Sequence, residues 1–145
     1  IAKIKELYGE KQGCWIGVAP FSIARGKILP FRKMKNVIAY FDKQPNTKIF
    51  LFGAGEMENE LLSDWQSLYE NVYAVHTNLK LDDELALMNN LDVMLCMDSA
   101  NMHLASLMAV PVVSVWGARD FFVNLLLCFT PNLCCSSIIA NCKSL

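Results

Sequence analysis

Residues 92–116 read DVMLCMDSANMHLASLMAVPVVSVW, and this stretch decides the fold. It opens with the apolar run 92–97, continues through a polar turn into the helical spacing of 101–108, and closes with the apolar run 110–116. Short apolar runs bounded by turn-forming residues are typical of buried parallel strands. Since a helical segment joins the two runs, the stretch predicts one right-handed strand-helix-strand unit.

The same alternation extends upstream. Three further apolar runs lie at 14–19, 48–52 and 71–75, and segments with helical spacing lie at 31–41, 56–69 and 82–90. Strands that alternate with helices in this way predict an α/β fold. The expected architecture is a Rossmann-like doubly wound parallel sheet of about five strands with helices on both faces.

Composition narrows the class of protein further. The chain has 145 residues, of which 54% are hydrophobic and 19% charged, and this favours a globular domain over a disordered chain. A net charge of −1 gives no electrostatic attraction for nucleic acid, so no nucleic-acid partner is expected. Neither a secretory signal nor an apolar stretch long enough to cross a bilayer is present, which predicts a cytoplasmic location.

The chain divides into three parts. Residues 1–13 are interpreted as a linker or the end of a preceding helix, and 14–120 as the ligand-binding domain. Residues 121–145 form an apolar, Cys-rich tail with one charged residue, Lys143. Two hypotheses for the tail stay open: an out-of-frame ending, or a helix at 120–129 that caps the sheet. Cys14 opens an apolar run, where we expect it to act as a small apolar side chain.

The sharpest candidate site is DSANMH at 98–103, which follows an apolar run and begins a helical segment. Asp98 or Ser99 can cap the helix, and its free N–H groups then offer an anion site in which His103 can take part. The structural alternative is that these residues only start a helix and that the histidine packs.

Two other candidate loops follow predicted strands, where ligands bind in open α/β sheets. The loop at 20–30 carries Ser22, Arg25 and Lys27, which suit a diphosphate, although a solvated basic loop has the same composition. The sequence GAGEME at 53–58 lacks the third glycine of a dinucleotide fingerprint. Its Glu56 and Glu58 could accept ribose hydroxyls or simply favour a helix N-terminus.

One weaker candidate remains. His76 and Thr77 follow the third predicted strand, near where a base or ribose would lie. Cys-x-x-Cys pairs are absent and neither histidine lies near the cysteine-rich tail, so no metal site is expected.

Together the motifs resemble glycosyltransferase family 9, the ADP-heptose:lipopolysaccharide heptosyltransferases. Residues 97–117 follow the family pattern D-[ST]-G-x-x-H-L-A-A-A-x-x-x-P-x-[VI]-x-[LIV]-[FY]-G with its spacing preserved. KILP at 27–30 resembles the family's K-x-W-P, and 52–58 resembles its G-G-x-x-E segment. Ala100 stands where the family has glycine, and Leu29 where it has tryptophan.

The resemblance implies that the chain is one half of a GT-B glycosyltransferase, the half that binds the nucleotide sugar. It implies phosphate contacts for Ser22 and Lys27 and a ribose contact for Glu58 or Glu56. The diphosphate would lie at the start of the helix after 98–99. The residues implied there are Ser99, Ala100 and His103, with Asp98 near the sugar or bracing the loop.

The implied reaction transfers a sugar from an ADP-heptose-like donor to a lipopolysaccharide core or related glycan acceptor, with no metal and no other cofactor. The general base and the lipid-linked acceptor would belong to an N-terminal domain that this chain lacks, so it is expected to be inactive alone. The full enzyme would work at the inner face of the inner membrane, with peripheral membrane association left open.

Two alternatives remain. One is a non-catalytic nucleotide-binding remnant. The other is a GT-B protein of the sugar-nucleotide epimerase type, which a preference for uridine over adenine nucleotides would favour.

Overall fold

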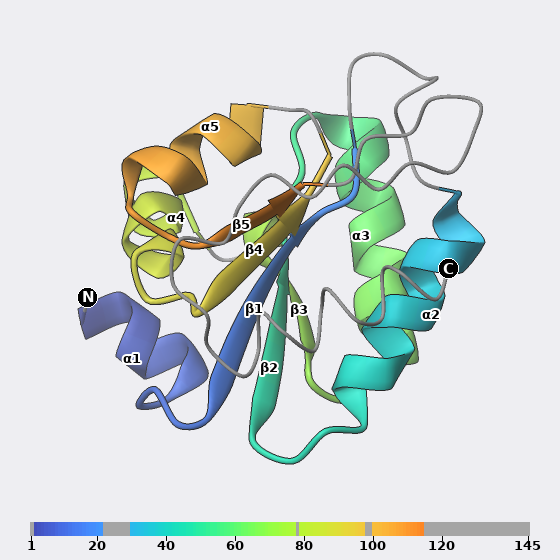
Figure 1. The fold of residues 1–145 in the computed structure, drawn as a ribbon, viewed down its shortest axis with the longest axis horizontal. Coiled ribbons are helices and arrows are strands. Elements are labelled where there is room, and N and C mark those ends of the chain that lie inside the picture. The colour runs from blue at the N-terminus through green and yellow to red at the C-terminus, as the bar shows by residue number, and fades with distance from the viewer. Residues whose placement is uncertain (1, 22–29, 78, 98–99, 115–145) are drawn as a thin grey trace.

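A central parallel sheet with helices on both faces forms the chain (Figure 1). The structure is a computed structural model that describes residues 2–21, 30–77, 79–97 and 100–114. In chain order the elements are α1 (Ala2–Tyr8), β1 (Cys14–Ala19), α2 (Phe31–Asp42), β2 (Thr47–Leu51), α3 (Glu56–Leu68), β3 (Val72–Ala74), η2 (Val75–Thr77), α4 (Leu81–Met88), β4 (Val93–Cys96), α5 (Ala100–Leu107) and β5 (Val112–Ser114).

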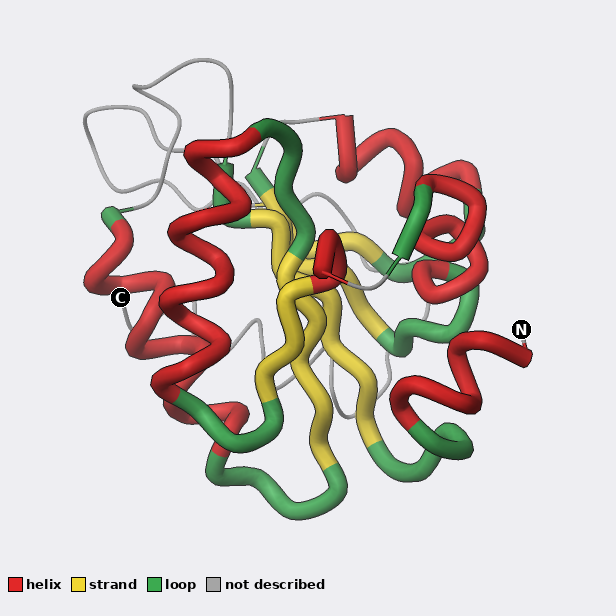
Figure 2. The backbone as a smooth tube through the Cα atoms, turned by 180° about the vertical axis from the view of Figure 1, so that it is seen from behind, coloured by secondary structure: helices red, strands yellow, loops and turns green. Residues whose placement is uncertain are grey.

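The strand order is β3-β2-β1-β4-β5, and all neighbouring strands run parallel. Ile16 of β1 lies opposite Ile49 of β2 on one side and Val93 of β4 on the other. Seen from behind, the strands lie between two layers of helices (Figure 2). The predicted fold class, a Rossmann-like doubly wound sheet of about five strands, is therefore confirmed.

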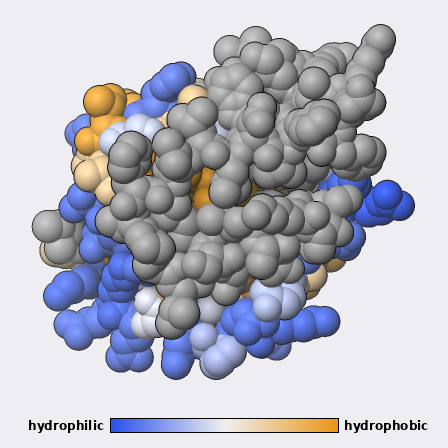
Figure 3. Space-filling view, in the orientation of Figure 1, coloured by the Kyte–Doolittle hydropathy of each residue, from blue (hydrophilic) through white to orange (hydrophobic). Residues whose placement is uncertain are grey.

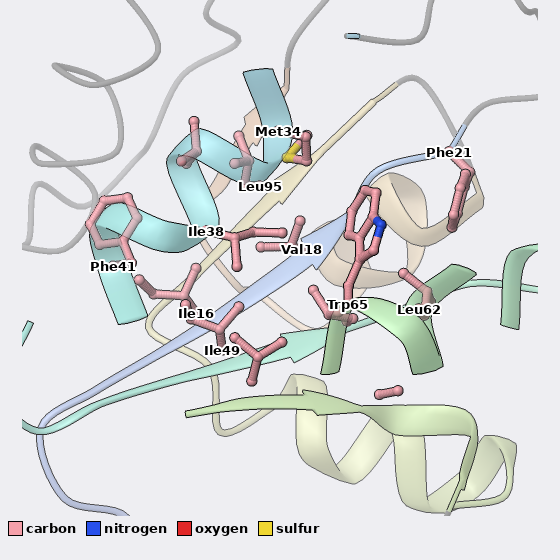
Figure 4. Packing of buried hydrophobic residues seen from close by; sticks show 14 of the residues in the cluster. Ile16, Val18, Phe21, Met34, Ile38, Phe41, Ile49, Leu62, Trp65 and Leu95 are labelled. Atoms are coloured by element: carbon pink, nitrogen blue, oxygen red, sulfur yellow. The ribbon is translucent and has the colours of Figure 1, made fainter. Parts of the chain in front are cut away.

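One face of the sheet packs against α2 and α3 (Figure 4). Ile16, Val18 and Ile49 point to this face, because alternate residues of a strand share a side of the sheet. From α2, Met34 and Ile38 complete the layer and are at most 1% exposed. Their spacing of one helical turn explains why this segment is a helix with a single buried stripe.

The opposite face packs against α1, α4 and α5. Trp15, Phe50 and Met94 alternate with the residues of the first face and are almost fully buried. Burial of each large apolar side chain stabilises the fold by about 1.5–3 kcal/mol. With both faces covered, the strands are mostly apolar, as the predicted runs are.

The N-terminal segment is part of this packing. Ile4 and Tyr8 of α1 are buried in the core of the second face, and the Lys3 Nζ atom lies 2.7 Å from an Asp83 carboxylate oxygen of α4. Cys14 is disulfide-bonded, which corrects the expectation that it acts only as a small apolar side chain. The sequence shows that Cys14 opens a strand and does not show what faces its sulfur.

Predicted and observed boundaries differ by one or two residues at most ends. The run 71–75 shortens to β3 because Val75 begins the 3-10 turn η2. The tail at 121–145, including the helix predicted at 120–129, lies outside the described residues. Across the described ranges, no helix is both long and apolar enough to cross a bilayer.

Candidate functional site at the carboxyl ends of the strands

The strand order reverses between β1 and β4, and this reversal locates the site. The chain leaves β1 toward α2 on one face of the sheet and leaves β4 toward α5 on the other. In Figure 1 the starts of α2, α3 and α5 gather at the upper edge, where the strands end. The connections diverge there, and ligands of doubly wound sheets bind at such a point, at the carboxyl ends of the strands.

The β4–α5 connection carries the sharpest predicted motif. Met97 is fully buried at the end of the strand, and α5 starts at Ala100, which is exposed. His103 is exposed in the first turn and forms no hydrogen bond to another described residue, so its imidazole is available to solvent. Predicted site residues Asp98 and Ser99 lie outside the described residues.

Packing fixes the orientation of α5. Ala105 is fully buried against the sheet, and Met102 and Leu104 pack partly against the same core. Leu107 is 81% exposed, and an apolar patch is visible over α5 in Figure 3. The helix ends where Ala109 adopts a φ of 57°, a left-handed conformation that turns the chain toward β5.

The β1–α2 connection begins and ends on aromatic residues. Phe21 follows β1 and Phe31 opens α2, and their ring centroids are 5.8 Å apart at an interplanar angle of 84°. Both rings also contact Trp65 of α3, at 6.5 and 5.5 Å between centroids. The predicted phosphate ligands Ser22 and Lys27 lie between these aromatic residues in the sequence, outside the described residues.

The β2–α3 connection is a tight turn. Gly55 precedes α3 with a φ of 87° and a ψ of 163°, a conformation that glycine adopts readily. The Glu58 carboxylate accepts a hydrogen bond of 2.8 Å from the backbone N–H of Ala54. Glu56, the first residue of the helix, is exposed. The structure thus separates the two predicted carboxylates: one is engaged with its own turn and the other faces solvent.

His76 lies in η2, directly after β3. Its Nε2 atom is 3.2 Å from the Ser63 hydroxyl of α3, and its Nδ1 atom is buried with no hydrogen-bond partner in the part of the chain that the structure describes. Burial lowers the pKa of this histidine below its ordinary value of 6.5, which favours the neutral ring. Thr77, the other residue predicted near the base or ribose, ends η2, and its side chain lies outside the described residues.

A polar concavity of about 700 Å³ adjoins this histidine, between α3 and the end of β3. Its lining includes Glu56, Asn59, Glu60 and Asp64. A second concavity of the same volume lies at the opposite edge of the sheet, lined by Thr47 and Asn71 among others. We place the candidate site at the first edge, because ligands of parallel α/β sheets bind at the carboxyl ends.

A sequence model described as glycosyltransferase family 9 (heptosyltransferase) matches residues 12–123. The chain belongs to glycosyltransferase family 9. That match covers β1 to β5 and includes every predicted site residue. No curated protein sequence matches.

Solved structures of heptosyltransferases share the fold of this family 9 chain. E. coli heptosyltransferase WaaC with ADP gives a TM-score of 0.69 at 16% identity, over 90% of this chain and 45% of that one. E. coli ADP-heptose lps heptosyltransferase II gives 0.67 at 17% identity, over 82% and 37%. A family 9 glycosyl transferase from Veillonella parvula gives 0.67 at 21% identity, over 96% and 42%. This chain spans less than half the length of these structures.

Metal ligands do not gather at the site: within the described ranges, no group of three or more His, Cys, Asp or Glu could hold a metal ion. Sequence reasoning did not anticipate the aromatic cluster of Phe21, Phe31 and Trp65. It also missed the bond from Ala54 to Glu58, although a glutamate at the third position of a helix is a recognisable sign that it reaches back to the preceding turn.

Proposed function

We propose that this chain is the donor-binding half of a heptosyltransferase, and that it holds a nucleoside diphosphate sugar at the carboxyl ends of β1 and β4. The observation that carries the proposal is the coincidence of the family motif with the reversal in strand order. The motif at 98–103 follows β4, and the segment with Ser22 and Lys27 follows β1, so both flank the expected crevice.

The start of α5 is the proposed diphosphate site. A helix N-terminus presents unpaired N–H groups and a partial positive charge, which suit an anion. Ser99 and Ala100 would supply donors there, and exposed His103 in the first turn would add a side-chain donor. Ala100 in place of the family's glycine keeps its N–H and narrows the approach by one methyl group.

The other proposed contacts to the donor come from the connections that follow β1 and β2, and from Asp98. Lys27 and Ser22 would bind the phosphates, and Glu56 or Glu58 would accept the ribose hydroxyls. Asp98 would lie near the sugar or brace the loop. The solved structure of WaaC is described with ADP, and a second is described with ADP-2-deoxy-2-fluoro heptose, which supports an adenine nucleotide sugar as the donor class.

In the proposed reaction, the sugar passes from the diphosphate to a glycan acceptor of the lipopolysaccharide core type. Donors at the start of α5 would stabilise the negative charge that develops on the leaving diphosphate, without a metal. A general base must also activate the acceptor hydroxyl. We propose that this base lies on another domain, in the cytoplasm at the inner face of the membrane, so residues 1–145 alone bind the donor and transfer no sugar.

Calorimetric titration with ADP tests the proposal. Wild-type chain should bind ADP more tightly than UDP, and His103→Ala should raise the Kd for ADP by roughly tenfold, the loss expected for one charge-assisted hydrogen bond. Ser106→Ala is the matched control, because Ser106 is exposed on the same helix and bonds only to the Met102 carbonyl. Absence of ADP binding would refute the proposal, and a preference for UDP would favour a sugar-nucleotide epimerase.

A further inference from the structure

We infer that Glu58 is a positioning residue: it holds the turn at residues 53–55 in shape and leaves Glu56 as the carboxylate that meets the ribose. This inference rests on the proposed function and decides between two glutamates that the sequence leaves equivalent. The observation that carries it is the hydrogen bond of 2.8 Å between the Ala54 N–H group and the Glu58 Oε2 atom.

That bond ties the residues before α3 to the first turn of the helix. Gly55 precedes α3 and has no side chain to accept the free N–H groups of the first turn. Glu58 is the third residue of the helix, from which a glutamate commonly reaches back to the residue just before the helix. Here it reaches one residue further, to Ala54, and so closes the whole turn rather than only its last residue.

Packing directs the Glu58 side chain inward. A Cβ atom on Gly53 would lie 3.3 Å from the Glu58 Oε2 atom and 2.8 Å from a methyl group of Leu62. The carboxylate therefore lies against the backbone of the turn, between the strand end and the helix. The Glu58 carboxylate already accepts a hydrogen bond from the turn, whereas Glu56 is exposed and lines the concavity between α3 and β3.

The turn also connects to the proposed crevice. Phe52, the residue before the turn, donates its N–H to the Val18 carbonyl of β1 at 2.9 Å. The start of the turn is therefore fixed to β1, one of the two strands between which the strand order reverses. The end of the turn is fixed by Glu58. Both constraints together set where the first residue of α3 lies, and Glu56 is that residue.

Substitution by glutamine separates positioning from direct contact. The amide oxygen of Glu58→Gln can still accept the Ala54 N–H, whereas Glu58→Ala cannot. We expect Glu58→Gln to bind ADP within about twofold of wild type and Glu58→Ala to bind about five- to tenfold more weakly. Glu70→Ala is the matched control and should bind ADP as wild type does, because Glu70 is exposed just beyond the end of α3 and lines the concavity at the opposite edge of the sheet.

Glu56→Gln should weaken binding of ADP but not of 2′,3′-dideoxy-ADP, which lacks both ribose hydroxyls. Exchange of the Ala54 amide hydrogen, followed by NMR, should stay slow in Glu58→Gln and accelerate in Glu58→Ala. Thermal unfolding followed by circular dichroism shows whether each variant is folded.

The inference is overturned if Glu58→Gln loses as much affinity as Glu58→Ala, since the charge itself would then matter, or if Glu58→Ala binds ADP as wild type does. Loss of affinity for dideoxy-ADP in Glu56→Gln would overturn its ribose contact. A wild-type chain that binds no ADP would instead refute the proposed function. Unchanged exchange of the Ala54 amide hydrogen in Glu58→Ala would by itself refute the positioning role of Glu58.

Discussion

Replacing Trp65 with alanine is expected to lower the free energy of unfolding by about 3–5 kcal/mol. The side chain is 2% exposed and lies between α2 and α3 (Figure 4). Its ring stacks on Phe21 at an interplanar angle of 29° and meets Phe31 edge to face at 80°. Aromatic pairs of this kind contribute about 0.5–1.5 kcal/mol each beyond the apolar area that they bury. Trp65 therefore belongs at the upper end of the range.

Urea unfolding followed by circular dichroism measures this loss. Leu68→Ala is the matched control, since Leu68 lies three residues further on the same helix and is 61% exposed; its effect should stay within about 0.5 kcal/mol. Trp65→Phe keeps a ring in the cluster, should fall between the two, and keeps the comparison measurable if the alanine variant does not fold. A loss below about 1 kcal/mol for Trp65→Ala would refute the packing described here.

The same variants connect packing to the proposed site. Phe21 and Phe31 border the segment that carries Ser22 and Lys27, so Trp65→Phe should raise the Kd for ADP more than Leu68→Ala does. Equal Kd values for the two variants would mean that the aromatic cluster of Phe21, Phe31 and Trp65 contributes to core packing and not to ADP binding.

Three further predictions concern single residues. Burial lowers the pKa of His76, so the folded state favours the neutral ring. The free energy of unfolding should therefore fall as the pH drops from about 6.5 through the folded-state pKa. In melting curves recorded at several pH values, His76→Gln should show a smaller decline. Ala109 has a φ of 57°, and Ala109→Gly should raise the free energy of unfolding by up to about 1 kcal/mol in urea titrations; a loss would mean that no strain is stored there. The Ser114 hydroxyl is buried without a hydrogen-bond partner among the described residues. Ser114→Ala should therefore be neutral or stabilising by up to about 1 kcal/mol, and clear destabilisation would reveal a partner.

The layout of the sheet could be predicted because buried parallel strands have a plain sequence pattern. Residues 14–19 form β1 as expected. Four of the apolar positions expected in 31–41 are the ones that α2 buries (Met34, Val37, Ile38 and Phe41), whereas Phe31 is 37% exposed. Both results follow from periodicity, which depends on residue type alone. Placement of candidate residues at strand ends followed from the fold class, since the carboxyl edge of a doubly wound sheet is where its connections meet.

The separate roles of Glu56 and Glu58 could not be read from the sequence. Both follow the same glycine, and both suit the first turn of a helix. The difference depends on the backbone of Gly55, whose φ of 87° turns the preceding residues so that the Ala54 N–H faces one carboxylate and not the other. Periodicity carries no information about such a turn.

Contacts between segments that are distant in the sequence could not be predicted for a different reason. Phe21 and Trp65 belong to separate connections, and no local pattern pairs an aromatic residue after one strand with one on a later helix. The pairing results from α2 and α3 covering the same face of the sheet, which brings both residues to its carboxyl edge. Knowledge of the strand order predicts the shared face, and only coordinates give the ring contact.

The small net charge makes these local details decisive for ligand binding. A chain with a net charge of −1 cannot attract a diphosphate by its overall field, so the affinity has to come from groups fixed at short range. Backbone N–H groups at the start of α5 and the turn held by Glu58 have this property, because their directions are set by the fold rather than by flexible side chains. For this reason, substitutions that alter backbone geometry, such as Glu58→Ala, are expected to affect ADP binding more than removal of an exposed charge at the opposite edge of the sheet, such as that of Glu70.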